Sequence, residues 1–204
     1  VLDSEFAGLL RGSRMRGDIL HTNTLTLLNA AADPGSVFGG GNVLTSFRRR
    51  DAIAVVDLEV ERVVWVLDGR TQGQHDPTLL ANGHLLIFDN QRSAEQGSRV
   101  IEIDPVTETI HWQYPESGPG PYSRCCGTAQ RLPNGNTLIT YTGPGRALEV
   151  TPAGKVVWEF ENPDRVKVTD EVIAQLMEDD DLIAQLMEVR RLPPAFTQSW
   201  LRDR

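Results

Sequence analysis

Apolar and polar residues alternate in short runs along most of the chain, and turn-forming residues separate the runs. Three of these runs share one plan: a short apolar strand, a turn rich in proline, glycine or acidic residues, and a second apolar strand that closes on a tryptophan. They end at Trp65, Trp112 and Trp158, which are 47 and 46 residues apart. A period of this length predicts a structural unit of sheet that is repeated along the chain.

Two Asn-Gly turns complete the predicted unit. LLANGHLLIFDN at 79–90 and RLPNGNTLITYT at 131–142 each place Asn-Gly between apolar runs, a strong hairpin signal. A hairpin followed by a strand pair gives four strands in roughly 45 residues, the size of a propeller blade. We therefore predict an all-β fold over 19–163, with about three four-stranded antiparallel blades that form half of a six-bladed ring. Because three blades leave two open edges, either a longer protein or a homo-oligomer is expected to complete the ring.

The two ends of the chain follow different patterns. Residues 1–18 show little periodicity and are interpreted as a lead-in. After residue 163 the apolar residues recur at helical spacing, and the hexapeptide IAQLME occurs at both 173–178 and 183–188. We predict an amphipathic helical segment within 164–204, packed on the sheets or used to bind a partner.

Composition narrows the classes of partner. The net charge of −8 argues against nucleic acid, whose phosphates attract a basic surface. No stretch reaches the 18 apolar residues of a membrane-spanning helix. The only cysteines, Cys125 and Cys126, are neighbours and cannot staple distant segments, so we expect no disulfide framework.

Four polar residues are candidates for a functional site. His21 opens one predicted first strand with Asn23 two residues on, and His75 opens the equivalent strand of the next unit. First strands line the central channel of a propeller, so these side chains are expected to converge there with Arg48, which follows the first hairpin. Two imidazoles, a guanidinium and an amide suit a tetrahedral anion. A histidine at a strand start is also a common hydrogen-bonded structural residue, and that alternative stays open.

The remaining histidines receive a structural interpretation. His84 lies in a hairpin turn and His111 directly precedes a tryptophan. In the third unit the position equivalent to His75 is Gly127, so the histidine series stops after two units.

An ordered set of motifs resembles the arylsulfotransferase family of bacterial and fungal propeller proteins. The set comprises HTN at 21–23, SFRRRDAIAVVD at 46–57, VVWVLDG at 63–69, QHDPTLL at 74–80 and FDN at 88–90. The spacing from Asp57 to Trp65 and from Asp104 to Trp112 is shared more widely, with quinoprotein-like propellers, and indicates fold rather than activity.

The resemblance implies sulfuryl transfer from a phenolic sulfate ester to a phenol, with no nucleotide sulfate donor, cofactor or metal. It makes His75 the nucleophile that carries the sulfuryl group, supported by His21, Asn23 and Arg48. We expect such a protein in the periplasm or outside the cell. The alternative is a non-catalytic propeller that serves as a binding or assembly scaffold. A quinone-dependent dehydrogenase is disfavoured, because the histidine and arginine set has no role in it.

Overall fold

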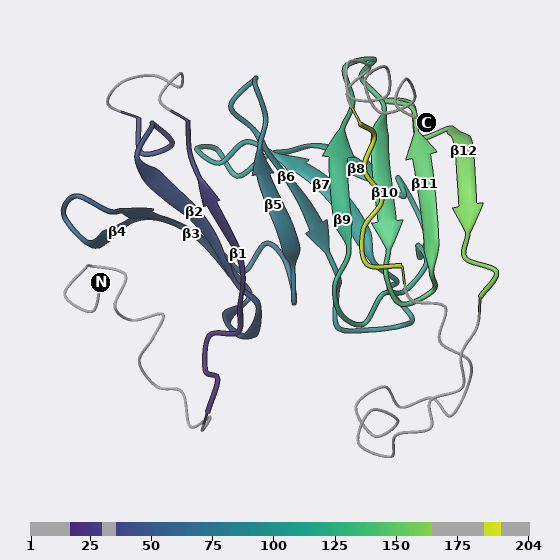
Figure 1. Ribbon diagram of the computed structural model, residues 1–204, viewed down its shortest axis with the longest axis horizontal. Coiled ribbons are helices and arrows are strands. Elements are labelled where there is room, and N and C mark those ends of the chain that lie inside the picture. The colour runs from purple at the N-terminus through teal and green to yellow at the C-terminus, as the bar shows by residue number, and fades with distance from the viewer. Residues whose placement is uncertain (1–16, 30–35, 165–185, 193–204) are drawn as a thin grey trace, which may run out of the picture.

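Three four-stranded antiparallel sheets stand side by side in the computed structural model, which describes residues 17–29, 36–164 and 186–192 (Figure 1). The first sheet consists of β1 (Thr22–Leu27), β2 (Asn42–Phe47), β3 (Ala52–Asp57) and β4 (Arg62–Asp68). The second consists of β5 (His75–Leu79), β6 (Leu85–Asp89), β7 (Arg99–Ile103) and β8 (Ile110–Tyr114). The third consists of β9 (Thr128–Arg131), β10 (Thr137–Tyr141), β11 (Arg146–Val150) and β12 (Val156–Glu161).

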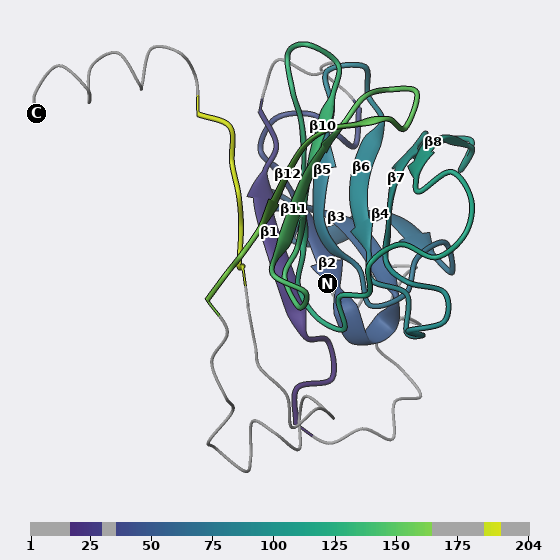
Figure 2. The same ribbon diagram turned by 90° about the vertical axis from the view of Figure 1, so that its right-hand side faces the viewer.

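Strand order within each sheet follows chain order, so every sheet is an up-and-down meander. The first strands of the three sheets are neighbours, because β5 packs against both β1 and β9. The outer strand of one sheet leads to the first strand of the next. This is the blade architecture of a β-propeller, and it confirms the all-β prediction of about three blades (Figure 2).

The alternation of side chains explains how the blades pack. In β6, Leu85 and Ile87 join an apolar cluster with the first sheet, whereas Leu86 and Phe88 join another with the third sheet. Successive residues of a strand point to opposite faces, so a strand that is covered on both faces must be continuously apolar. The run LLIF therefore marks a blade that has a neighbour on each side.

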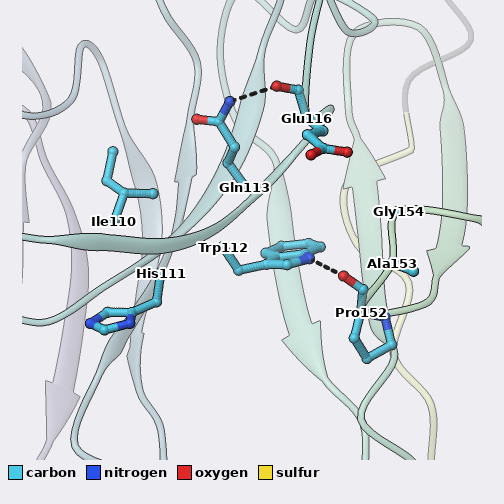
Figure 3. Close-up of a pocket in the computed structure, with 8 residues that line it drawn as sticks. All are labelled: Ile110, His111, Trp112, Gln113, Glu116, Pro152, Ala153 and Gly154. Carbon is cyan, nitrogen blue, oxygen red and sulfur yellow. Dashed lines mark hydrogen bonds between the residues drawn. The ribbon is translucent and has the colours of Figure 1, made fainter.

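The repeated tryptophans connect each blade to the next. Trp65 on β4 donates its indole N–H to the Pro105 carbonyl in the β7–β8 turn, at 3.1 Å. Trp112 on β8 donates in the same way to the Pro152 carbonyl in the β11–β12 turn, at 2.9 Å (Figure 3). Trp158 on β12 is 39% exposed, and no residue in the described part of the chain accepts its N–H.

The predicted C-terminal helix is wrong where it can be examined. Residues 165–185 and 193–204 lie outside the described residues, but Leu186–Leu192 contains no helix. Its backbone groups bond to the third sheet, where Leu186 N–H donates to the Thr142 carbonyl and Val189 N–H to the Thr140 hydroxyl. These partners replace the carbonyls four residues back that a helix would use.

Helical structure is scarce in the rest of the described chain. Across 17–29, 36–164 and 186–192 the one helix is a single 3-10 turn at Arg48–Arg50. Over the same residues no helix is long and apolar enough to cross a membrane.

Candidate functional site

His75 begins β5, beside both neighbouring blades, and only 9% of its surface is exposed. The pairing of β5 with β6 shifts register between His75 and Thr78, and Asp76 takes a left-handed conformation there with φ of 51°. Such irregularities re-aim side chains next to functional sites. Gln74 anchors this corner, because its side-chain amide donates to the Ala52 carbonyl of the first sheet at 2.9 Å.

Asn90 determines which nitrogen of the His75 ring carries the proton. The Asn90 amide nitrogen donates to two backbone carbonyls, those of Ser123 and Cys126, each at 2.8 Å. Its oxygen is therefore left to face His75 Nδ1, 2.7 Å away. An amide oxygen only accepts, so Nδ1 must be the protonated nitrogen. The lone pair of neutral His75 consequently resides on Nε2.

Burial keeps His75 neutral. The pKa of its imidazole is lowered from 6.5 to about 4, mainly by desolvation and also by the nearby Arg48 and His21 charges, although hydrogen bonds to Asn90 and the Gly73 backbone act in the opposite direction. At neutral pH the ring therefore has a free lone pair and no charge, the form required of a nucleophile.

Arg48 contributes the positive charge beside His75. It stands in the 3-10 turn that follows β2, and its Nη2 donates to the Arg124 carbonyl at 3.3 Å. Its Nε is buried with no hydrogen-bond partner, so one strong donor remains available there. Arg49 points elsewhere, because its guanidinium donates to the Asp18 carbonyl at 2.6 Å.

Asn23 and His21 lie on the first-sheet side of His75, but they do not share a regular strand as the sequence predicted. β1 begins at Thr22, its pairing shifts register before Thr24, and His21 has a φ of 49°. Asn23 donates to the Gln74 carbonyl at 2.8 Å, and its own side-chain oxygen is buried with no partner.

The partly exposed side chain of His21 points toward a carboxylate. Its Nδ1 lies 2.8 Å from Asp18 Oδ2, an ion-pair distance without good hydrogen-bond geometry. The backbone N–H of His21 donates to the other oxygen of the same carboxylate at 2.8 Å. Because its charge still influences the pKa of His75, His21 belongs to the surroundings of that imidazole.

Two parts of the site were not predicted from the sequence. One is the orienting role of Asn90, although the FDN motif contains it. The other is the loop before β9, which supplies the carbonyls that hold Asn90. In this loop the Cys125 thiol has a lowered pKa, because Cys126 donates a hydrogen bond to it and Arg48 and Arg124 attract its negative form.

The third blade cannot repeat the histidine. Gly127, which the sequence aligned with His75, has a φ of 131°, and a Cβ placed on it would lie 2.4 Å from the Phe88 ring. The aromatic ring of the second blade fills the space that a side chain there would need.

A group of possible metal ligands lies apart from His75 in the second blade, in the β5–β6 turn, just after β7 and on β8. Donor atoms of His84, Asp104 and His111 lie within 4.8 Å of one another. The two imidazoles are stacked, with centroids 4.5 Å apart and planes 20° apart. The lone pairs lie in the ring planes and therefore run side by side instead of converging, so this arrangement does not fit a shared metal ion.

A cavity of about 460 Å³ opens at the outer junction of the second and third blades (Figure 3). The hydrogen bonds of its polar groups are made within the protein. Trp112 bonds to Pro152, and the Gln113 side chain donates to the Glu116 carbonyl at 3.0 Å. Because none of the candidate residues lines it, the chemistry is assigned to the surroundings of His75.

Solved structures similar to this chain are propellers and other proteins of low sequence identity. Hydrazine synthase of Kuenenia stuttgartiensis is 14% identical, with a TM-score of 0.48, and the match covers 76% of this chain and 39% of that one. Virginiamycin B lyase from Staphylococcus aureus is 19% identical, with a TM-score of 0.47 and coverage of 73% and 43%. The WD40 propeller domain of Doa1 is 14% identical, with a TM-score of 0.47 and coverage of 71% and 40%. The chain thus spans about two fifths of the length of these proteins.

No curated protein matches the chain. The sequence profile of the arylsulfotransferase (ASST) family does match, over residues 6–163, a range that contains all three sheets and every residue of the site around His75. The chain belongs to the arylsulfotransferase family.

Proposed function

We propose that this chain carries the nucleophile of an arylsulfotransferase, which moves a sulfuryl group from a phenolic sulfate ester to a phenol through His75. One observation carries the proposal. Asn90 holds the proton on Nδ1 while burial keeps the ring neutral, so Nε2 of His75 is a free nucleophile at neutral pH.

The reaction proceeds by two successive displacements at sulfur. Nε2 attacks the sulfur of the donor ester, an N–S bond forms, and the S–O bond to the phenolate breaks. The imidazole ring becomes cationic while Nδ1 keeps its proton and donates it in the hydrogen bond to the Asn90 oxygen, and this positive charge makes the sulfuryl group labile. An acceptor phenol then attacks sulfur, and the N–S bond breaks and returns its electron pair to Nε2. His21 takes the proton from this phenol, having given one to the first phenolate.

Unpartnered polar atoms near His75 match the other needs of this chemistry. The buried Nε of Arg48 is a donor for the sulfuryl oxygens, whose negative charge the guanidinium also offsets. The buried side-chain oxygen of Asn23 is an acceptor for a phenol hydroxyl.

The test is release of p-nitrophenol from p-nitrophenyl sulfate with phenol as acceptor. We expect His75→Ala to abolish turnover, whereas His84→Ala, which removes an imidazole from the β5–β6 turn, should leave it unchanged. In the absence of acceptor, mass spectrometry should find one sulfuryl group on the peptide that contains His75. Full turnover in His75→Ala would overturn the proposal.

A scaffold role is the second candidate, because both end sheets expose apolar side chains. Leu25 and Leu27 on β1 are 76% and 63% exposed, and Val157 and Phe160 on β12 are 50% and 40% exposed. Such surfaces are suited to protein partners. An intact chain that binds a partner through these residues and shows no turnover with any aryl sulfate would favour this candidate.

A further inference from the structure

Chain connectivity gives the first indication of what Leu186–Leu192 is. In this fold the outer strand of each blade leads to the inner strand of the next, as β4 leads to β5 and β8 leads to β9. β12 is the outer strand of the third blade, and the next described segment after its end is Leu186–Leu192. In both views this segment, drawn in yellow, lies against the sheet of β9–β12 (Figures 1 and 2).

The direction of the segment is that of an inner strand. Three of its backbone N–H groups donate to the third sheet, in the pairs Leu186 to the Thr142 carbonyl at 3.2 Å, Val189 to the Thr140 hydroxyl at 3.0 Å, and Arg191 to Gln130 Oε1 at 2.9 Å. Residue numbers rise along the segment while they fall along β10, so it runs antiparallel to β10 and parallel to β9. Neighbouring inner strands of a propeller are parallel in this way.

The junction between the second and third blades provides a template for comparison. Arg131, at the end of the inner strand β9, donates to Glu102 Oε2 of the second blade at 2.7 Å. Its guanidinium also lies over the Trp112 ring, 5.2 Å from the centroid. Within the second blade, Glu102 and Trp112 are cross-strand partners on β7 and β8. One arginine of the incoming inner strand thus contacts both members of this pair.

Arg191 repeats both contacts on the third blade. Its Nη2 forms an ion pair with Glu149, and its guanidinium lies 6.0 Å from the centroid of the Trp158 ring. Glu149 and Trp158 are cross-strand partners on β11 and β12, as Glu102 and Trp112 are in the blade before.

The sequence repeats along with the contacts. Arg131 is followed by Leu-Pro, and so is Arg191. At the first junction an apolar pair replaces the glutamate and the arginine. Val55, the cross-strand partner of Trp65, shares an apolar cluster with Leu79 of β5. Each junction therefore joins a complementary pair at this position.

We propose that residues 186–192 are the inner strand of a fourth blade. The propeller then continues beyond residue 163. Trp65 and Trp112 donate to the turn between the two outer strands of the next blade and not to its inner strand. The inner strand of a fourth blade would therefore not by itself supply an acceptor for Trp158. The assignment also restricts dimerisation. Residues 186–192 occupy the face of the third blade on which β1 of a second copy would pack, so they would have to be displaced before such a dimer could form.

Arg191→Leu in the full chain tests the assignment, with the adjacent Arg190→Leu as its matched control. In the wild type, the Val189 amide should exchange with deuterium at least tenfold more slowly than the same amide in a short peptide. Arg191→Leu should abolish this protection and lower the urea midpoint, because it leaves buried Glu149 without its cation. Arg190→Leu should do neither.

A double variant copies the first junction onto the third blade. Glu149→Val with Arg191→Leu reproduces the Val55 and Leu79 pair and should restore protection of the Val189 amide. If Arg191→Leu acted only by lowering overall stability, the second substitution would not restore that protection. Wild-type Val189 exchanging at the peptide rate would overturn the proposal. So would equal effects of Arg191→Leu and Arg190→Leu, or a double variant no better protected than Arg191→Leu.

Discussion

The second and third blades share their construction and differ where chemistry is expected. Each has an Asn-Gly hairpin, a glutamate opposite its tryptophan and an arginine from the next inner strand bound to that glutamate. At the start of the inner strand, however, the second blade carries His75 and the third carries Gly127.

The difference shows that the site belongs to the junction and not to one blade. The second blade supplies His75 and Asn90, whereas the loop that leads into the third blade supplies the backbone carbonyls of Ser123 and Cys126 that hold Asn90. Repeated positions hold the blades together, and positions that break the repeat orient the His75 imidazole.

The largest effect is expected from giving the third blade a side chain at this position. Gly127→Ala places a Cβ into the Phe88 ring and strains a backbone that has a φ of 131°, so we expect the free energy of unfolding to fall by about 3 kcal/mol. Gly154→Ala also has a positive φ but meets no atom within 4 Å, and it should cost only about 1 kcal/mol. Equal losses in urea titrations would mean that Phe88 does not determine the difference between the blades.

The lowered pKa of His75 gives the next effect, on stability against pH. The folded imidazole resists protonation down to about pH 4, whereas the unfolded one takes a proton near 6.5, so stability is lost as pH falls from 6.5 through 4. Relative to His75→Gln, the wild type should lose about 3 kcal/mol over this range.

The comparison with His75→Gln is needed because Asp76 titrates in the same range. Burial raises its pKa to about 6, and its contribution is lost in the opposite direction, as pH rises through that value. A His75 ring signal that titrates near 6.5 by NMR would contradict the assignment of a neutral, buried imidazole.

Asn90→Ala tests whether orientation of His75 matters beyond its presence. The variant frees Nδ1 to exchange its proton with Nε2 and removes the acceptor that holds the ring. We expect kcat/KM for p-nitrophenyl sulfate to fall about 100-fold, the usual scale for losing one orienting group. Asn134→Ala, in the hairpin of the third blade, should leave the rate unchanged. If Asn90→Ala were as active as the wild type, orientation of His75 by Asn90 would not be needed for the reaction.

Sequence pattern was sufficient for the blades because their signals are local. Alternation, Asn-Gly turns and tryptophan spacing all lie within a window of one blade. The orienting role of Asn90 is not local, because its partners come from a loop more than thirty residues later. No periodicity encodes which carbonyls that loop will present.

Two local expectations failed because the backbone departs from its regular period. Alternation placed His21 and Asn23 on one strand face, but the register shift in β1 interrupts that relation. Helical spacing at 183–188 predicted a helix, yet from Leu186 onward the described chain is not helical, and the Leu186 N–H donates to the Thr142 carbonyl just after β10, where tertiary hydrogen bonds outweigh local propensity.

The smallest effect should distinguish the three tryptophans. Trp112→Phe keeps most of the apolar surface but removes the N–H donated to Pro152, so we expect a loss of about 1 kcal/mol in urea titrations. Trp65→Phe should lose the same amount, because it donates to Pro105 in the same geometry. Trp158→Phe removes an N–H that has no acceptor among the described residues, so its stability should not change measurably. A loss at Trp158 equal to the other two would mean that a further acceptor already holds the outer strand of the third blade, and that this junction is completed beyond its inner strand.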